Sequence, residues 1–191
     1  FVNIALSPFG TTARDASNLL NIVNDRAKIN KAVSDMYANG GTNVGDGMRV
    51  GFHKMFTTGT RDPLLEQRDY AIILTDGACN AYYTGYPTGE TIPKGSSAVG
   101  GSNTTSNING ALAYISAVYD AFKTRIDKAY IIGFSAVKSE KEQGSNIGRR
   151  TGGSGNPANN YYDASSAEQL RAIYEEIRGE ITRELWYVMG P

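Results

Sequence analysis

The segment Tyr70–Gly77 joins an unbroken apolar run to an acidic turn. The residues Ile72–Leu74 are typical of a parallel strand that helices cover on both faces, because such a strand lacks polar alternation. In open α/β sheets, ligands bind outside the carboxyl ends of the strands. We therefore expect Asp76, which follows this strand at once, to lie in a functional position.

The upstream segment Gly40–Met48 is typical of a loop that leads into a helix. Its two leading glycines allow a tight backbone path, and Thr42 and Asn43 offer side-chain oxygens. Apolar residues then recur at helical spacing, at Met48, Phe52, Met55 and Phe56. Thr42 is therefore predicted to lie where the loop meets the helix.

Together these two segments resemble the von Willebrand factor type A family, which includes integrin inserted domains and bacterial pilus or adhesin proteins. The resemblance implies an α/β fold with a doubly wound, mostly parallel sheet and helices on both faces. It also implies a metal-ion-dependent adhesion site, which this family builds from three pieces of sequence. These are an Asp-x-Ser-x-Ser loop after the first strand, a threonine that matches Thr42 and an aspartate that matches Asp76. The first piece does not occur in this sequence.

The resemblance thus implies Thr42 and Asp76 as metal ligands and Mg²⁺, or else Mn²⁺ or Ca²⁺, as the ion. Hard cations of this kind prefer oxygen ligands, which a hydroxyl and a carboxylate supply. In the family, the bound ion accepts an acidic side chain from a protein ligand. In the alternative interpretation, Thr42 and Asp76 only support hydrogen bonds of their loops.

The resemblance also implies an incomplete sheet. Phe1–Ser7 reads as a strand and matches the second strand of the family. We therefore expect residues 1–191 to form a single domain that lacks its first central strand. An upstream segment or another chain would supply that strand between Val2–Leu6 and Ile72–Leu74, together with the missing loop.

The rest of the chain alternates helical and strand patterns, as in a parallel sheet covered by helices. Helices are expected from Asp25, from Thr42 to about Phe56, from Ile108 to Phe122 and after a capping box at 165–168, and strands at 129–134 and 161–162. A second capping box is predicted at 139–142, followed by a glycine-rich loop. Residues 77–107 are predicted to be a long polar insertion loop, which either forms a recognition surface through its tyrosines or has no such role.

Composition excludes several classes of function. Lys and Arg number 19, as do Asp and Glu, so nucleic acid is not an expected partner. The single Cys79 and single His53 exclude a zinc site built from Cys and His alone. No stretch has the length and apolarity of a membrane helix. Many Gly, Tyr, Asn, Ser and Thr residues favour an extracellular or cell-surface location.

The sequence therefore predicts an extracellular adhesion or protein-binding domain with a remnant or split metal site, and no catalysis. One alternative is a structural subunit of a surface appendage whose metal site does not function. Another is an α/β hydrolase-like enzyme, but Gly133–Val137 lacks the second glycine of a nucleophile elbow and Gly40–Gly47 lacks the lysine of a P-loop. For a catalytic pair of Cys79 and His53, the separation of the two residues in the sequence is the only argument.

Overall fold

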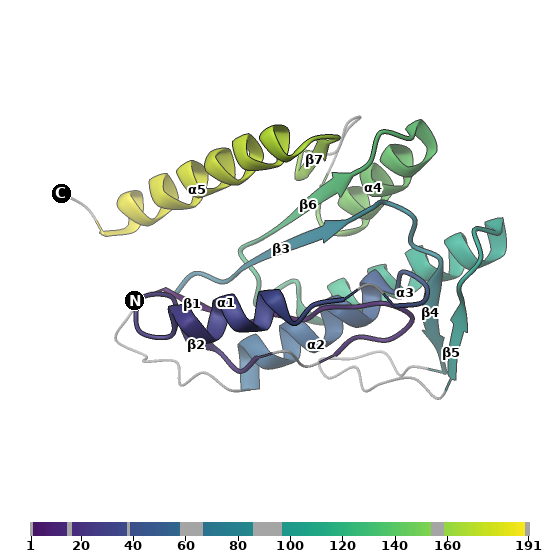
Figure 1. Ribbon diagram of the computed structural model, residues 1–191, viewed down its shortest axis with the longest axis horizontal. Coiled ribbons are helices and arrows are strands. Elements are labelled where there is room, and N and C mark those ends of the chain that lie inside the picture. Colours follow the sequence, from purple (N-terminus) through teal and green to yellow (C-terminus); the bar gives the residue numbers. More distant parts are fainter. Residues whose placement is uncertain are drawn as a thin grey trace. The chain divides into compact units, whose positions relative to one another are not determined.

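The computed structural model describes residues 2–14, 17–37, 39–57, 67–85, 97–153 and 159–189, with side chains to residue 185. The chain divides into two compact units, which are described separately (Figure 1). Unit 1 comprises Phe1–Thr60 and Cys79–Lys123, and unit 2 comprises Arg61–Ala78 and Thr124–Pro191. The single domain over residues 1–191 stays a prediction.

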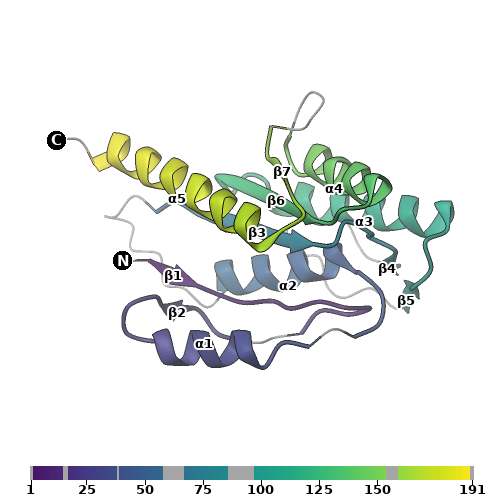
Figure 2. The same cartoon turned by 45° about the horizontal axis from the view of Figure 1, so that its top comes forward.

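Unit 1 contains two short antiparallel strand pairs and three helices. Its elements are β1 (Asn3–Ile4), β2 (Leu20–Asn21), α1 (Arg26–Ser34), α2 (Val44–Thr57), β4 (Ala81–Thr84), β5 (Ser97–Gly100) and α3 (Thr105–Phe122). Strand β1 pairs with β2, and β4 pairs with β5. Figure 2 shows α1 following directly on the β1–β2 pair.

The core of unit 1 lies where α2, α3 and β4 meet. Phe52 of α2 contacts Phe122 of α3 edge to face, with ring centroids 5.5 Å apart. Tyr83 of β4 meets Tyr114 of α3 in the same way at 6.3 Å. These aromatic pairs hold the three elements together because each buries a large apolar area in a defined orientation. Helix α1, in contrast, contains no buried residue.

Unit 2 is a three-stranded parallel sheet with two helices. Its elements are β3 (Tyr70–Thr75), β6 (Lys128–Phe134), α4 (Lys138–Arg150), β7 (Tyr161–Ala164) and α5 (Ala167–Met189). The strand order is β3-β6-β7, so β6 is central. Ile72 of β3 lies opposite Tyr130 of β6, and Ile132 of β6 lies opposite Tyr162 of β7.

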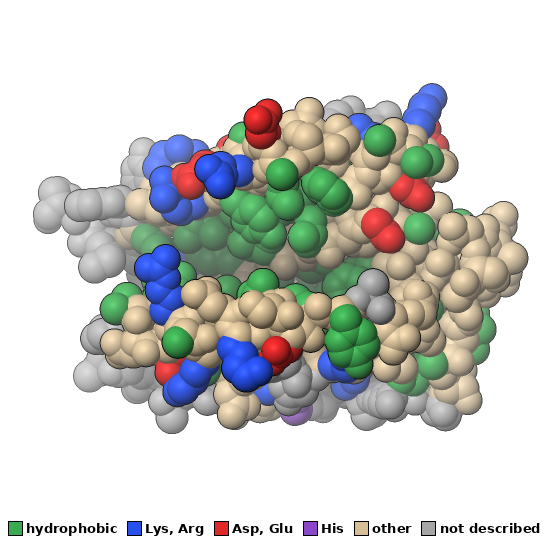
Figure 3. All heavy atoms as spheres, viewed as in Figure 1, with side chains coloured by type: hydrophobic (Ala, Val, Ile, Leu, Met, Phe, Trp, Pro, Cys, Tyr) green, Lys and Arg blue, Asp and Glu red, His purple; other side chains and the backbone are tan. Residues whose placement is uncertain are grey.

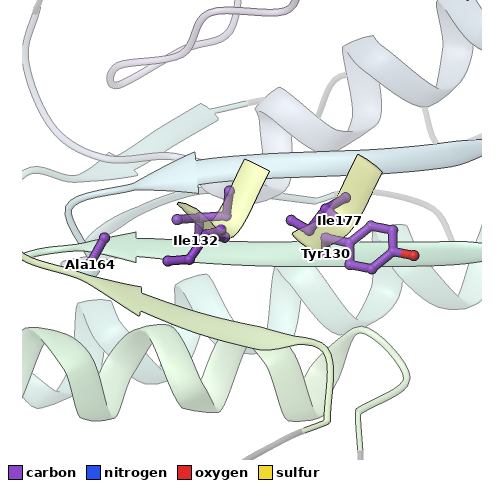
Figure 4. Packing of buried hydrophobic residues seen from close by; sticks show 5 residues of the cluster. Tyr130, Ile132, Ala164 and Ile177 are labelled. Atoms are coloured by element: carbon purple, nitrogen blue, oxygen red, sulfur yellow. The ribbon is translucent and has the colours of Figure 1, made fainter. Parts of the chain in front are cut away.

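The two helices of unit 2 cover opposite faces of its sheet. Tyr130, Ile132 and Ala164 pack against Ile173 and Ile177 of α5, as the side chains in Figure 4 illustrate. On the other face, the Tyr161 ring lies against Gly133 of β6 and Gly144 of α4. Residues 129–133 of β6 are therefore all buried, because successive side chains point to opposite faces.

The predicted fold class is wrong for the chain as a whole. Among the described residues, only β3, β6 and β7 form a parallel sheet, and the other strands form isolated antiparallel pairs. The run Val2–Leu6 does not join the parallel strands because it uses its backbone groups locally. Asn3 and Ile4 pair with Asn21 and Leu20, and the Leu6 N–H donates to Ser17 Oγ at 3.0 Å.

Several local predictions also need correction. The expected loop over 77–107 contains β4 and β5 and the start of α3, while residues 86–96 lie outside the described residues. Helix α4 begins after Val137, ahead of the capping box expected at Ser139, and runs on to Arg150. The cap of α5 is shifted by one residue, since Ser166 Oγ accepts the Gln169 N–H at 3.2 Å.

The helices and strands expected around the other apolar patterns are confirmed. Helix α2 covers the predicted helix after Thr42, and α3 covers the stripe from Ile108 to Phe122. Strands β3, β6 and β7 lie at the three predicted strand positions in unit 2.

Gly144→Ala tests how tightly α4 packs on the sheet. A Cβ at Gly144 would lie 2.6 Å from Cε2 of Tyr161, so this variant should unfold at lower denaturant than wild type. Gly179→Ala is the matched control, because the nearest atom to its Cβ is the flexible Arg183 end at 3.6 Å. Alanine is favoured over glycine in a helix by about 1 kcal/mol, so the control should gain stability. Urea unfolding of both variants measures the difference, and equal gains would show that α4 packs loosely.

Alkaline pH should destabilise unit 2. Burial raises the pKa of Tyr161 and of Tyr162 to about 12, with Asp163 and Glu180 respectively adding to the effect. The unfolded chain loses these protons near pH ~10. The stabilisation by the neutral phenols is thus complete below pH 10 and is lost as the pH rises through 12.

Urea unfolding at pH 9 and pH 11 measures this loss. Tyr162→Phe should lose less stability between the two values than wild type, because one titrating group has been removed. An identical loss in the variant would contradict the assignment to Tyr162.

Candidate functional site

Thr42 lies in a loop of unit 1, where its backbone groups make hydrogen bonds to Asn80 and Ala81. Its N–H donates to Asn80 Oδ1 at 2.9 Å, and its carbonyl accepts the N–H groups of Asn80 and Ala81 at 3.1 and 3.2 Å. The Thr42 hydroxyl has no hydrogen-bond partner within the described residues. The loop is therefore fixed independently of the side chain that was predicted to bind a metal.

Asn43 and Asp46 form the buried start of α2. Asn43 caps the helix, because its Oδ1 accepts the Asp46 N–H at 3.0 Å. The Asp46 carboxylate, only 1% exposed, accepts the Ala13 N–H at 2.6 Å and bonds with Nη2 of Arg49 at 2.7 Å. Asp46 thus has a structural role at the N-terminus of α2, where a carboxylate also interacts favourably with the helix dipole.

Asp76 lies at the carboxyl end of β3 in unit 2, as predicted. It is exposed and, within the part of unit 2 that the structure describes, has no hydrogen bond or ion pair. The turn around it is rigid, because Thr75 Oγ1 accepts the Gly77 N–H at 3.2 Å. Gly77 has a φ of 93°, and a Cβ there would lie 2.2 Å from the carbonyl oxygen of Glu140. The turn therefore requires glycine and presents Asp76 to solvent.

The structure places Thr42 in unit 1 and Asp76 in unit 2. Within the described ranges, no group of three or more His, Cys, Asp or Glu could hold a metal ion. Thr42 and Asp76 as oxygen ligands of Mg²⁺, Mn²⁺ or Ca²⁺ stay a prediction, which a titration of the protein with these ions would test.

Sequence reasoning missed the polar residues that share the strand ends with Asp76. Ser135 follows β6, donates its hydroxyl hydrogen to Glu140 and accepts the Val137 N–H at 2.9 Å. Lys141 of α4 pairs with Asp163 of β7 at 2.9 Å. The position of Ser135 directly after an apolar strand is a signal that could have identified it, as it did Asp76. Because Ser135 is bonded to Glu140 and Lys141 to Asp163, these four residues stabilise this edge, whereas Asp76 is exposed and has no partner among the described residues.

Cys79 and His53 were the one residue pair considered for the enzyme alternative. Cys79 is completely buried, and His53 is exposed on α2. Solvent therefore has no access to the sulfur in this structure, and the arrangement favours a packing role for Cys79 over that of a nucleophile.

The sequence predicted that a strand is missing beside β3. Strand β3 lies at the end of the order β3-β6-β7, so one edge has no strand partner among the described residues. The runs Val2–Leu6 and Ile72–Leu74 do not pair with each other. Ile72 and Leu74 are 44% and 42% exposed, although aliphatic residues of a parallel strand are normally covered. Unit 2 therefore has an exposed apolar sheet edge.

Comparison with solved structures identifies a similar fold. The minor pilin PilB from Streptococcus sanguinis aligns with a TM-score of 0.72 and 23% identity, and a point mutant of it with a TM-score of 0.77 and 24% identity. Each alignment covers 99% of this chain and 51% of the pilin chain. The chain shares its fold with half of a minor pilin. No family model matches the sequence, and no curated protein does.

These comparisons correct the family assignment. The von Willebrand factor type A resemblance rested on two short segments, and it is not supported, because the similar structures are minor pilins and no family model matches. The interpretation as an adhesion domain is not supported either, and the metal-ion-dependent adhesion site loses the resemblance that implied it. Two short motifs are a weak basis for a family, since glycine turns and helix caps recur wherever a loop enters a helix.

Asp46→Ala should strongly destabilise unit 1. Breaking a buried ion pair costs about 3–5 kcal/mol, because the remaining charge is left without its partner; here Asp46 is 1% exposed and the side chain of Arg49 is 16% exposed. The control is Asp120→Ala, which breaks an exposed pair with Lys123 and should have little effect, since surface ion pairs contribute little. Chemical denaturation measures both variants. Similar losses for the two would mean that Asp46 does not stabilise the start of α2.

Proposed function

We propose that this chain is a structural subunit of a pilus-type surface appendage and acts outside the cell by binding other subunits. The observation that carries the proposal is the shared fold with PilB, which extends over 99% of the chain. Among the described residues, no helix has the length and apolarity needed to span a membrane. The proposal corresponds to the first alternative of the sequence analysis.

The free edge of β3 supports a role in assembly. An edge strand presents a row of unpaired N–H and C=O groups, which is a template for pairing with another strand. Natural proteins commonly protect such edges with charges or proline. Here the run Ile72–Leu74 contains neither, so the edge is open to a partner strand.

Side chains beside the edge favour the same kind of partner. Ile72 and Leu74 point to the face of the sheet that α5 covers, because they lie opposite the α5-facing Tyr130 and Ile132. Figure 3 shows apolar side chains gathered over this part of unit 2. An added strand would bring its own apolar residues against Ile72 and Leu74, and such cross-strand pairs each contribute about 0.2–1 kcal/mol.

We therefore propose that a neighbouring subunit adds a strand to β3. Main-chain hydrogen bonds would supply affinity, and alternate side chains of the added strand would supply specificity. The added strand thus comes from another chain. The sequence had left two sources open, another chain and an upstream segment.

Replacing Ile72 and Leu74 with Lys should prevent incorporation into filaments. Charges on an edge strand block strand addition, and both side chains are already exposed, so the unit should stay folded. Tyr174→Lys is the control, since Tyr174 is a similarly exposed apolar residue on α5. Tagged chains are expressed in the native host, and filaments sheared from the cells are probed for the tag.

Wild type and the Tyr174 variant are expected in the filaments, and the double variant is not. Absence of the wild type from any surface structure would contradict the role as an appendage subunit. Incorporation of the double variant at the wild-type level would overturn the role of β3. Slow hydrogen exchange at the outer β3 amides of the unassembled protein would instead indicate a strand from the same chain.

A further inference from the structure

A small polar hollow lies in unit 1, and neither Thr42 nor any residue of β3 lines it. It is formed by the loop after β1 and the segment after α1, and its lining residues are Gly10, Thr11, Thr12, Arg14, Tyr37 and Asn39. Its volume is about 70 Å³. A single water needs about 10–15 Å³ of such space, so the hollow has room for a carboxylate-sized group.

Arg14 gives the hollow its charge. The guanidinium carbon lies 3.9 Å from the centroid of the Tyr37 ring, and Nη2 donates to the Tyr37 carbonyl at 3.2 Å. These two contacts orient the guanidinium but use only one of its five N–H donors. Within the described residues, no carboxylate pairs with Arg14. With respect to the described residues, the remaining donors are available to a ligand.

The loop that carries Arg14 is preorganised. Thr11 Oγ1 accepts the Gly41 N–H at 2.8 Å, and the buried Asn43 donates its N–H to the Gly10 carbonyl at 2.8 Å and its Nδ2–H to the Thr11 carbonyl at 3.0 Å. The loop is thus attached to the start of α2 by several hydrogen bonds. A ligand would find the hollow already formed, which lowers the entropic cost of binding.

The charges around the hollow favour an anion. None of its lining residues is acidic. The two acids that flank α1 are already paired, Asp25 with Lys28 and Asp35 with Lys31. A planar guanidinium matches a carboxylate with two parallel hydrogen bonds, and the exposed Thr12 hydroxyl at the rim can donate a further one.

We propose that this hollow binds a side-chain carboxylate of a partner protein through Arg14. That the partner is a neighbouring appendage subunit rests on the function proposed above, whereas carboxylate binding itself does not. The acidic ligand residue expected from the sequence would then be recognised by an arginine without a metal ion.

The test is an NMR titration of the ¹⁵N-labelled chain with N-acetylglutamate α-amide, which carries one carboxylate. Signals of the Arg14 Nε–H and of the Gly10–Thr12 amides should shift, while N-acetylglutamine α-amide, its neutral analogue, should leave them unchanged. Arg14→Gln should weaken binding at least about 10-fold, since a charge-assisted hydrogen bond contributes about 1.5–3 kcal/mol. Arg14→Lys should retain part of the affinity. Arg26→Gln removes an equal charge from α1 outside the hollow and should bind as wild type does.

Equal shifts with the acid and its amide would overturn the proposal, as would full affinity in Arg14→Gln. Tighter binding of inorganic phosphate at the same residues would overturn the preference for a carboxylate. If Arg14→Gln does not fold, the same titrations of two other proteins decide whether the hollow binds a carboxylate. The acid and its amide are then compared on the wild type and on Thr12→Val. Because the probe is a small molecule, failure to bind it would not affect the filament experiment. Failure of the chain to enter filaments would likewise not affect the titration.

Discussion

The burial of β6 on both faces is the constraint on which unit 2 depends. Tyr130 and Ile132 face α5, while Ile131 faces the side that α4 covers, and all three are completely buried. Burying an aliphatic side chain of this size contributes about 1.5–3 kcal/mol. Burial of this one strand therefore stabilises the packing of both helices against the sheet. With β6 in the centre, β3 and β7 are left at the edges. The exposed edge of β3 follows from this order.

Unit 1 depends on a different kind of interaction. Its aromatic core joins α2, α3 and β4, but its loops are positioned by the polar residues Asn43 and Asp46 at the start of α2. Both are buried, and both bond to backbone groups between Gly10 and Ala13. A helix that is already fixed by its apolar face thereby fixes a loop that has few apolar contacts of its own. The Arg14 hollow is built on that loop.

The two proposed contacts are complementary in physical character. Strand addition at β3 is an extended main-chain contact with apolar support, whereas the Arg14 hollow recognises one charged group. Neither proposed contact requires chemistry on a substrate. Such surfaces suit a protein that binds its neighbours in an assembly.

The sequence by itself determined the elements whose signals are local. The apolar run at Ile72–Leu74 correctly predicted a strand, and the apolar stripe of α2 correctly predicted a helix, because both patterns lie within one element. The expectation that this strand is covered on both faces was wrong, since Ile72 and Leu74 are exposed. The sequence also placed Asp76 at the end of β3. It did not determine the family, since the short matches around Thr42 and Asp76 are met by any loop that needs a glycine turn and a helix cap.

Tertiary structure decided everything that requires residues far apart in the chain to meet. The β1–β2 pair, the β4–β5 pair inside the expected loop, and the contact of Arg14 with Tyr37 leave no periodic signal in the sequence. Tyr83 entered a strand because its ring fills the core beside Tyr114, which lies 31 positions further along the chain. Tertiary structure also decided which strand edge stays open. Strand pairing depends on packing against neighbouring elements more than on the strand's own residues.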